Sequence, residues 1–363
     1  MTRRRGSFWP SPTQERLLRT ALGESAEGLE AWRSLAGFQV PEVEPGTFPV
    51  LPLVYRAVSR MAPDDPELAR LKGIYRNSWL KNNLMLETVA ESLTALEEAG
   101  VEPLMVGSLP AAVRYYAELA LRPTATLDFV LATDALVPAV RALGQIGWRA
   151  PAPVHTGAEG PVTMTNAKGQ VCLLLTAIAP DFSPSTDLLL AASVELELGG
   201  RIVRAAAPGD DLLIACARGG RVWPVRSVQW LIDAVQILRS APEKVDWERL
   251  LELAGEHLQT VRVREALRYL DEVAGTPLTA PASLGRRQVS RRERLAYRCA
   301  GAAVPGLGSL PQAVSEHLCS SREASPLRTA RAFPGFLQRR WGLEHPWQLP
   351  GAAGQRALRD RDD

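Results

Sequence analysis

The amino-acid sequence predicts an α+β fold, in which a small mixed sheet with its own helices is flanked by N-terminal and C-terminal helical regions. Apolar residues recur with a helical period towards both ends of the chain, whereas short apolar runs separated by turn residues fill the middle. The chain has 363 residues, of which 46% are hydrophobic, so it has enough apolar material for more than one core. We expect four parts: an N-terminal helical region over residues 1–100, an α/β core over 101–207, a C-terminal helical domain over 208–340 and a tail over 341–363.

The N-terminal region opens with a helix-start signal. Ser11 can cap a helix that begins at Pro12, and Gln14 completes a capping box. Helical periodicity continues, after a break near "VEPGTFPVLP", into the long segment "DPELARLKGIYRNSWLKNNLMLETVAESLTALEEAG". Residues 11–100 are therefore expected to be mostly helical, with Gly100 ending the last helix.

The middle of the chain alternates between predicted strands and helices. The apolar strand "VEPLMVG" turns at Gly107 and Ser108 into the helix "LPAAVRYYAEL". The segments "ATLDFVLA" and "QVCLLLTAI" are predicted strands, with the helix "DALVPAVRALGQIGW" between them, and "VELELGGRIVRAA" predicts a hairpin. Beyond it, the helical period returns in "PGDDLLIACARGG", "VRSVQWLIDAVQILRS", "DWERLLELAGEHL" and "TVRVREALRYLDEVAG".

Composition excludes several classes of function. The four cysteines form no C-x-x-C pair and there are only four histidines, so we expect neither a zinc site nor a disulfide framework. The 40 acidic residues are interspersed with the 42 basic ones, which argues against a nucleic-acid partner. No apolar h-region follows the basic N-terminus, and no run approaches the roughly 18 apolar residues of a membrane span. We expect a cytoplasmic protein without a membrane partner.

The turn at Gly107 and Ser108 is the first candidate site. A strand that leads into a helix N-terminus through Gly-Ser presents backbone N–H groups and a hydroxyl, which suit the terminal phosphates of a nucleotide. On the next strand, Asp128 shares one face with Thr126 because side chains alternate along a strand. These residues predict a binding site at one edge of the α/β core.

This layout resembles an uncharacterised nucleotidyltransferase family whose members carry a "KG" turn, an "R-P-x-x-D-x-D" strand, a later "D-L-H" strand and an "L-H…W-L-x-D" helix. The resemblance implies that a pair of carboxylates holds two Mg²⁺ ions for attack at the α-phosphate of a nucleoside triphosphate. It also implies a bacterial setting and, because relatives occur beside peptide natural-product genes, a role in specialised metabolism. The family positions retained here are Gly107, Ser108, Arg122, Pro123, Asp128, Trp230 and Asp233.

The chain departs from the family pattern where the polar chemistry is expected. The replaced positions are Val106 for a lysine, Thr126 for the first carboxylate, Cys172 and Leu174 for aspartate and histidine, and Ile214 and Arg218 for histidines. Two divalent ions about 3.5–4 Å apart need several anionic oxygens. One aspartate, a hydroxyl and a thiol are a weak substitute, so ordinary two-metal catalysis is not expected.

Asp128 is left as the candidate catalytic and metal-binding residue. It either binds one metal ion or a substrate amine, or it is structural and pairs with Arg122 or accepts backbone N–H groups. Loop carboxylates that are conceivable further ligands, or plain solvated charges, are Glu118, Asp134, Asp181 and Asp187.

The other candidate binding residues each have a second, structural interpretation. The resemblance makes Cys172 face the cleft, yet its apolar neighbours favour a buried thiol. Trp230, with Trp223, lines a substrate groove or belongs to the helical core. Arg218, with Arg221 and Arg226, meets an anionic substrate or faces solvent, and Asp233 is expected to anchor its helix to an arginine.

Three functions remain open. The leading hypothesis is a nucleotidyltransferase-fold protein with a degraded two-metal site that acts as a non-canonical or accessory protein in bacterial specialised peptide metabolism. The second is an active enzyme that uses Mg²⁺ and moves a nucleoside monophosphate to a small-molecule or peptide acceptor. The third is a helical partner-binding protein. The expected ligand is a small molecule, a nucleotide or a peptide.

Overall fold

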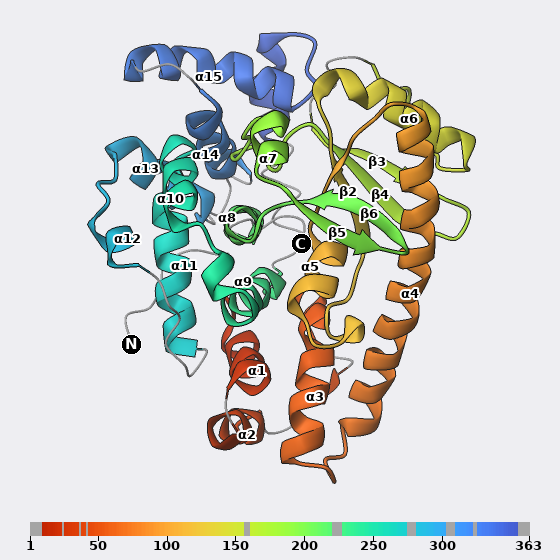
Figure 1. Cartoon of the computed structure of the whole chain (residues 1–363). Coiled ribbons are helices and arrows are strands. Elements are labelled where there is room, and N and C mark those ends of the chain that lie inside the picture. The colour runs from red at the N-terminus through yellow and green to blue at the C-terminus, as the bar shows by residue number, and fades with distance from the viewer. Residues whose placement is uncertain are drawn as a thin grey trace.

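The computed structural model describes residues 9–23, 25–35, 38–40, 43–155, 160–219, 227–273, 281–302, 309–321 and 325–354. Within these residues, a six-stranded mixed sheet lies beside a long helix, and helices from both ends of the chain pack together on the other side (Figure 1). The expected α+β fold is confirmed.

The N-terminal region is helical, as predicted. Its helices are α1 (Pro12–Leu22), α2 (Ser25–Arg33), α3 (Leu51–Met61) and α4 (Leu68–Glu98), with a short 3₁₀ helix η2 (Pro45–Val50) before α3. The capping box at the start of α1 is present: the Ser11 hydroxyl accepts from the backbone N–H of Gln14, whose side chain accepts from the backbone N–H of Ser11. The 31-residue helix α4 runs along the outer side of the sheet (Figure 1).

The sheet has the strand order β3-β4-β2-β1-β6-β5. Its strands are β1 (Leu104–Val106), β2 (Thr126–Val130), β3 (Val162–Thr165), β4 (Val171–Leu175), β5 (Val194–Leu198) and β6 (Arg201–Ala205). The pairs β1/β6 and β2/β4 are parallel, whereas β1/β2, β3/β4 and β5/β6 are antiparallel. Five helical segments connect the strands: α5 (Ser108–Tyr115), η3 (Leu119–Leu121), η4 (Thr133–Ala135), α6 (Leu136–Gln145) and α7 (Thr186–Ala191).

The two faces of the sheet belong to two separate cores. The outer core, under α4 and α6, takes Leu127 and Phe129 from β2. The inner core takes Val130 and packs the sheet against helices from both ends of the chain. Thr126 and Asp128 share the inner face with Val130, because alternate residues of a strand point the same way. The polar residues of β2 therefore face the helical part of the molecule.

The C-terminal region consists of helices around the inner core and above it. These are α8 (Pro208–Gly219), α9 (Gln229–Ser240), α10 (Trp247–Glu256), α11 (Thr260–Val273), α12 (Ala282–Arg286), α13 (Arg291–Ala300), α14 (Leu310–Ser320) and α15 (Pro326–Arg340). Ala313, Leu337 and Trp341 form a small third core between α14 and α15. None of the helices in the described part of the chain combines the length and apolarity needed to cross a membrane.

Candidate functional site

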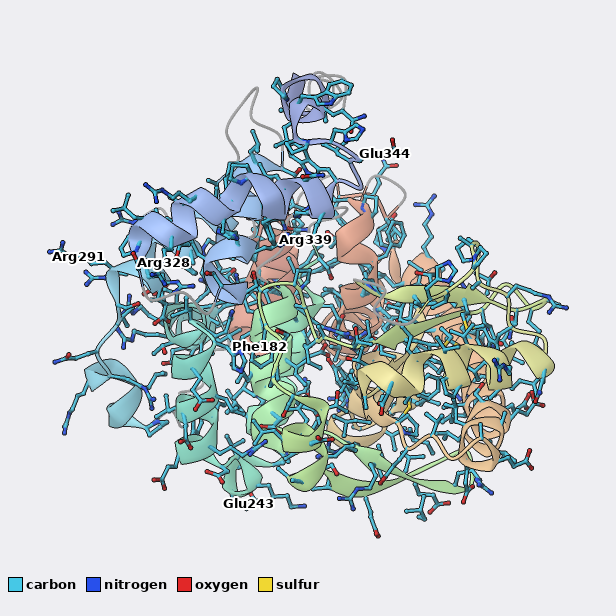
Figure 2. All side chains as sticks on the ribbon, turned by 90° about the horizontal axis from the view of Figure 1, so that it is seen from above. Phe182, Glu243, Arg291, Arg328, Arg339 and Glu344 are labelled. Carbon is cyan, nitrogen blue, oxygen red and sulfur yellow. The ribbon has the colours of Figure 1, made fainter. Side chains whose placement is uncertain are left out.

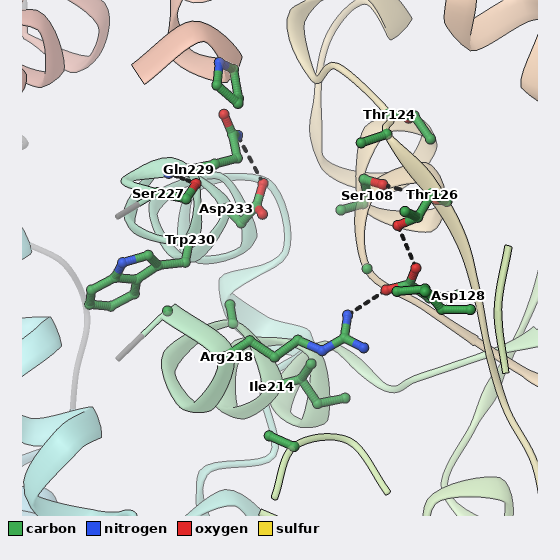
Figure 3. Close-up of a pocket in the computed structure, with 18 of the residues that line it drawn as sticks. Ser108, Thr124, Thr126, Asp128, Ile214, Arg218, Ser227, Gln229, Trp230 and Asp233 are labelled. Carbon is green, nitrogen blue, oxygen red and sulfur yellow. Dashed lines mark hydrogen bonds and ion pairs between the residues drawn. The ribbon is translucent and has the colours of Figure 1, made fainter. Parts of the chain in front are cut away.

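A cavity of about 1260 Å³ lies where the inner face of the sheet meets the helices. Its walls come from β2, β4 and the start of α5 on one side, and from α4, α8, α9 and α15 on the others. In Figure 3, Thr126 and Asp128 approach it from the sheet and Ser108 from the start of α5, whereas Arg218, Gln229 and Asp233 approach it from α8 and α9. The structure thus brings together segments more than one hundred residues apart.

Gly107 shapes the wall of the cavity beside Asp128. It has φ +84°, a conformation that glycine adopts without steric cost, and it directly precedes α5. A Cβ atom here would lie 2.9 Å from Oδ2 of Asp128 and 3.2 Å from Nη1 of Arg218. The next residue, Ser108, lines the same wall, with its Oγ 3.4 Å from the carbonyl oxygen of Thr126. The predicted turn at Gly107 and Ser108 therefore does face a cavity.

Both carboxylate oxygens of Asp128 already have partners. Oδ1 accepts a hydrogen bond of 2.6 Å from the Thr126 hydroxyl, and Oδ2 forms a 2.6 Å ion pair with Nη1 of Arg218. The Nε of Arg218 donates to the backbone oxygen of Ile178, which holds the guanidinium in place. The structural interpretation expected Arg122 as the partner of Asp128, and this is wrong: the partner is Arg218, from the last turn of α8.

Arg122 instead binds Asp233, through two hydrogen bonds. Nε lies 2.7 Å from Oδ1 and Nη2 lies 2.8 Å from Oδ2. Oδ1 also accepts from the hydroxyl of Tyr116 at 2.6 Å and from the amide of Gln229 at 3.2 Å. Burial, and then the charge of Asp233, raise the pKa of Tyr116 well above its ordinary value, so it donates at neutral pH. The expectation that Asp233 anchors α9 to an arginine is confirmed.

A third carboxylate on the cavity wall, Asp211, was not singled out from the sequence. Its Oδ2 accepts from Arg114 and from the hydroxyl of Tyr115, each at 2.8 Å. Burial raises the pKa of Asp211 to about 7, although both partners act in the opposite direction. An acidic residue in the first turn of a helix is common because it suits the helix dipole, so "PGDD" carried no recognisable signal.

Cys172 does not reach the cavity, so the expectation that it faces the cleft is wrong. It pairs in register with Leu127 and is completely buried in the outer core. The residue beside Asp128 on β4 is Leu173, which lines the cavity in its place. Burial raises the pKa of the Cys172 thiol further above its ordinary range, so it is inert as a nucleophile at neutral pH.

Trp230 lines the cavity but is 6% exposed and belongs to the inner core. Its ring packs so closely on Gly219 that a Cβ there would be 1.9 Å from the ring, and its centroid is 6.1 Å from that of Trp9. Trp230 is therefore a packed wall residue. Trp223, Arg221 and Arg226 lie outside the described residues.

The residues around Asp128 do not fit a two-metal centre. Nowhere in the described ranges do three or more His, Cys, Asp or Glu side chains gather so that they could hold a metal ion. The neighbours of Asp128 are a hydroxyl, a guanidinium and the apolar Leu173. None of the four loop carboxylates proposed as substitutes lines the cavity: Glu118, Asp134, Asp181 and Asp187. Two of them have other partners, since Tyr75 donates to Glu118 and Arg262 pairs with Asp181.

The comparison with protein-family profiles identifies one family. The sequence profile of a family described as "Uncharacterised nucleotidyltransferase" matches residues 49–275. No curated protein matches the sequence significantly. Among solved structures, the antibiotic-resistance factor ANT(2'')-Ia is similar with a TM-score of 0.36 and 14% identity, over 53% of this chain and 97% of that one. An antigenic nucleotidyltransferase-like protein from Paracoccidioides brasiliensis has a TM-score of 0.35 and 14% identity, over 56% and 97%. Similarities this low carry no argument about function.

Proposed function

Since this chain belongs to the uncharacterised nucleotidyltransferase family, we propose that it is a member in which an ion pair occupies the place of the two-metal centre. In this proposal the protein binds a small-molecule, nucleotide or peptide ligand in the cavity and does not carry out ordinary two-metal nucleotidyl transfer. It acts as a non-canonical or accessory protein, and the family resemblance points to bacterial specialised peptide metabolism as its setting.

The observation that carries the proposal is that both carboxylate oxygens of Asp128 already have partners in the protein. Its two oxygens accept from Thr126 and Arg218 at 2.6 Å each, and its side chain is only 6% exposed. A guanidinium is always protonated, so it supplies a permanent positive charge at the carboxylate. A divalent ion would have to displace that charge and would then find one aspartate where several anionic oxygens are needed.

The cavity itself favours ligand binding over the alternative of a purely helical partner-binding protein. Its volume of about 1260 Å³ exceeds the roughly 300–1,000 Å³ of typical small-molecule sites. Gly107 and Ser108 lie on its wall. A core with only a packing role would have filled this space with side chains.

The experiment that tests the proposal is calorimetric titration with ATP, GTP, CTP and UTP, each with and without Mg²⁺ or Mn²⁺, together with an assay for nucleotide turnover. We expect no metal-dependent turnover. Ser108→Trp serves as the control that blocks the cavity, because Ser108 lines its wall. Turnover of a nucleoside triphosphate with Mg²⁺ at an ordinary enzymatic rate, abolished by Asp128→Ala, would establish the active-enzyme alternative instead.

A further inference from the structure

The charges on the cavity wall are almost balanced. Its acidic residues are Asp128, Asp211 and Asp233, and its basic residues in the described part of the chain are Lys81, Arg122, Arg218 and Arg339. Each of the three carboxylates is paired with an arginine, Asp211 through Arg114, which lies just behind the wall. A ligand with several negative charges, such as a nucleoside triphosphate, would therefore meet few cations that are not already paired.

Lys81 is a cation outside these pairs. It lies on α4 and is exposed, and it forms no ion pair with any residue that the structure describes. Figure 2 labels a further basic residue of the wall, Arg339 on α15, near the middle of the molecule, whereas Arg291 and Arg328 lie at its edge. Lys81 therefore adds one positive charge to the wall beyond the three arginine–aspartate pairs.

Arg218 has donor capacity left for a ligand. Nη1 binds Asp128 and Nε binds the backbone of Ile178, while Nη2 has no hydrogen-bond partner among the described residues. The Arg218 side chain is 26% exposed, against 12% for Arg122. In Figure 3 its guanidinium lies at the boundary between α8 and the sheet, where the cavity separates them. An anionic oxygen could bind here without breaking the contact to Asp128.

The rest of the wall is mainly apolar. Leu173 and Leu175 project from β4, Ile178 follows them in the chain, and Ile214 and Phe336 come from α8 and α15. Apolar surface of this kind stabilises an apolar ligand by excluding water, at about 25 cal/mol per Å² buried. A few polar groups in a mainly apolar cavity set the orientation of the ligand.

Resting on the proposed function, we infer that the ligand is an apolar carboxylic acid with a single negative charge. The carboxylate binds Nη2 of Arg218, Lys81 supplies the balancing positive charge, and the apolar body lies along Leu173, Ile178 and Phe336. This chemistry occurs in a free aliphatic or aromatic acid and at the C-terminus of a short apolar peptide. The binding needs no metal ion.

The test compares acids with their uncharged amides. Octanoic acid and octanamide form one pair of probes, and N-acetyl-Leu-Leu-Leu with a free or an amidated C-terminus forms the other, measured by calorimetry without divalent ions. In at least one pair we expect the acid to bind ten-fold or more tightly than the amide, and the pair that shows this identifies the source of the carboxylate. Equal binding of acid and amide in both pairs, or no binding of any probe, would overturn the inference.

Variants assign the contact to named residues. Arg218→Gln is expected to weaken acid binding at least ten-fold and to remove the preference for the acid over the amide, and Lys81→Gln to weaken acid binding several-fold. Arg218→Lys retains the charge beside Asp128 and keeps the preference for the acid, so it separates loss of the contact from loss of the fold. Acid binding that survives Arg218→Gln would overturn the assignment. Metal-dependent nucleotide turnover would instead overturn the proposed function, so the two failures are distinguishable.

Discussion

Two arginine–aspartate pairs on the wall of one cavity differ in how exposed the arginine is and in how many hydrogen bonds it makes to the carboxylate. In the Arg122–Asp233 pair both side chains are 12% exposed, and Asp233 accepts from Tyr116 and Gln229 as well. In the Arg218–Asp128 pair the arginine is 26% exposed and uses one terminal nitrogen on the carboxylate. The Arg122–Asp233 pair is thus a structural ion pair. In the Arg218–Asp128 pair the arginine can still contact a ligand.

The largest expected loss of stability comes from breaking the Arg122–Asp233 pair. Arg122→Ala leaves the Asp233 carboxylate buried without its cation, so we expect the free energy of unfolding to fall by about 3–5 kcal/mol in denaturant titrations. Arg218→Ala is the matched comparison and should cost less, about 2–3 kcal/mol: Asp128 is also left buried, but Thr126 stays bound to it and the more exposed arginine leaves space that water from the cavity can fill. A loss in Arg122→Ala no larger than in Arg218→Ala would contradict the comparison.

The next largest loss of stability is expected at Gly107, which lies close to the Arg218–Asp128 pair. Gly107→Ala should destabilise the fold by roughly 2–3 kcal/mol, through its positive φ and the clash with Asp128 and Arg218. Gly200→Ala is the control, since Gly200 has a similar φ of +78° but open space around the added Cβ. Thermal unfolding of both variants separates backbone strain from contact with the ion pair. Equal losses of stability in Gly107→Ala and Gly200→Ala would show that the contact with the ion pair does not contribute to the cost.

The Thr126 hydroxyl is expected to contribute less. Thr126→Val keeps the shape of the side chain and removes the donor to Asp128, which still has Arg218, so we expect a loss of about 1–2 kcal/mol. Thr163→Val, at an exposed position on the edge strand β3, should change stability little. Denaturant titrations of the two variants measure the difference in their free energies of unfolding. A loss in Thr126→Val as small as that in Thr163→Val would show that the hydrogen bond is not stabilising.

The third pair, Arg114–Asp211, predicts a pH effect. The folded-state pKa of Asp211 is about 7 and the unfolded value is 3.8, so the folded protein binds the proton more tightly. Stability from this group is therefore full below about pH 4 and is lost as the pH rises towards 7, by up to about 1.4 kcal/mol per pH unit. Asp211→Asn should lack this slope in unfolding experiments between pH 4 and 7, whereas Glu195→Gln on β5 should retain it. Parallel curves for wild type and Asp211→Asn would refute the pKa assignment.

Much of the fold was predictable because it depends on local patterns. The capping box at Ser11, the turn at Gly107 and the hairpin after Val194 each have a signal within a few residues, and all three are present. Strand β3 was missed because "VTMT" lies at the edge of the sheet and buries only Met164, so it has little apolar pattern to recognise.

The site was harder to predict because its contacts are not local. The segment "VCLLL" is apolar on both faces, so alternation could not show that Cys172 points away from the cavity; that depends on the register of Leu173 with Asp128. Arg218 meets Asp128 across 90 residues of sequence. The sequence could predict that Asp233 pairs with some arginine, because a buried carboxylate needs a cation. It could not predict that this arginine is Arg122, because the pairing depends on how α9 packs.

The contact between Arg218 and Asp128 also restricts how this chain can evolve. A divalent-ion centre would need new carboxylates at Thr126 and Leu173, which flank Asp128 on the same face of the sheet, and the removal of Arg218. Losing the arginine first leaves Asp128, 4% exposed, without a counter-charge, and gaining a carboxylate first adds a second anion beside one cation. We expect each intermediate sequence to be less stable than its parent. The Arg218–Asp128 pair is therefore easier to keep than to replace by a metal centre one mutation at a time.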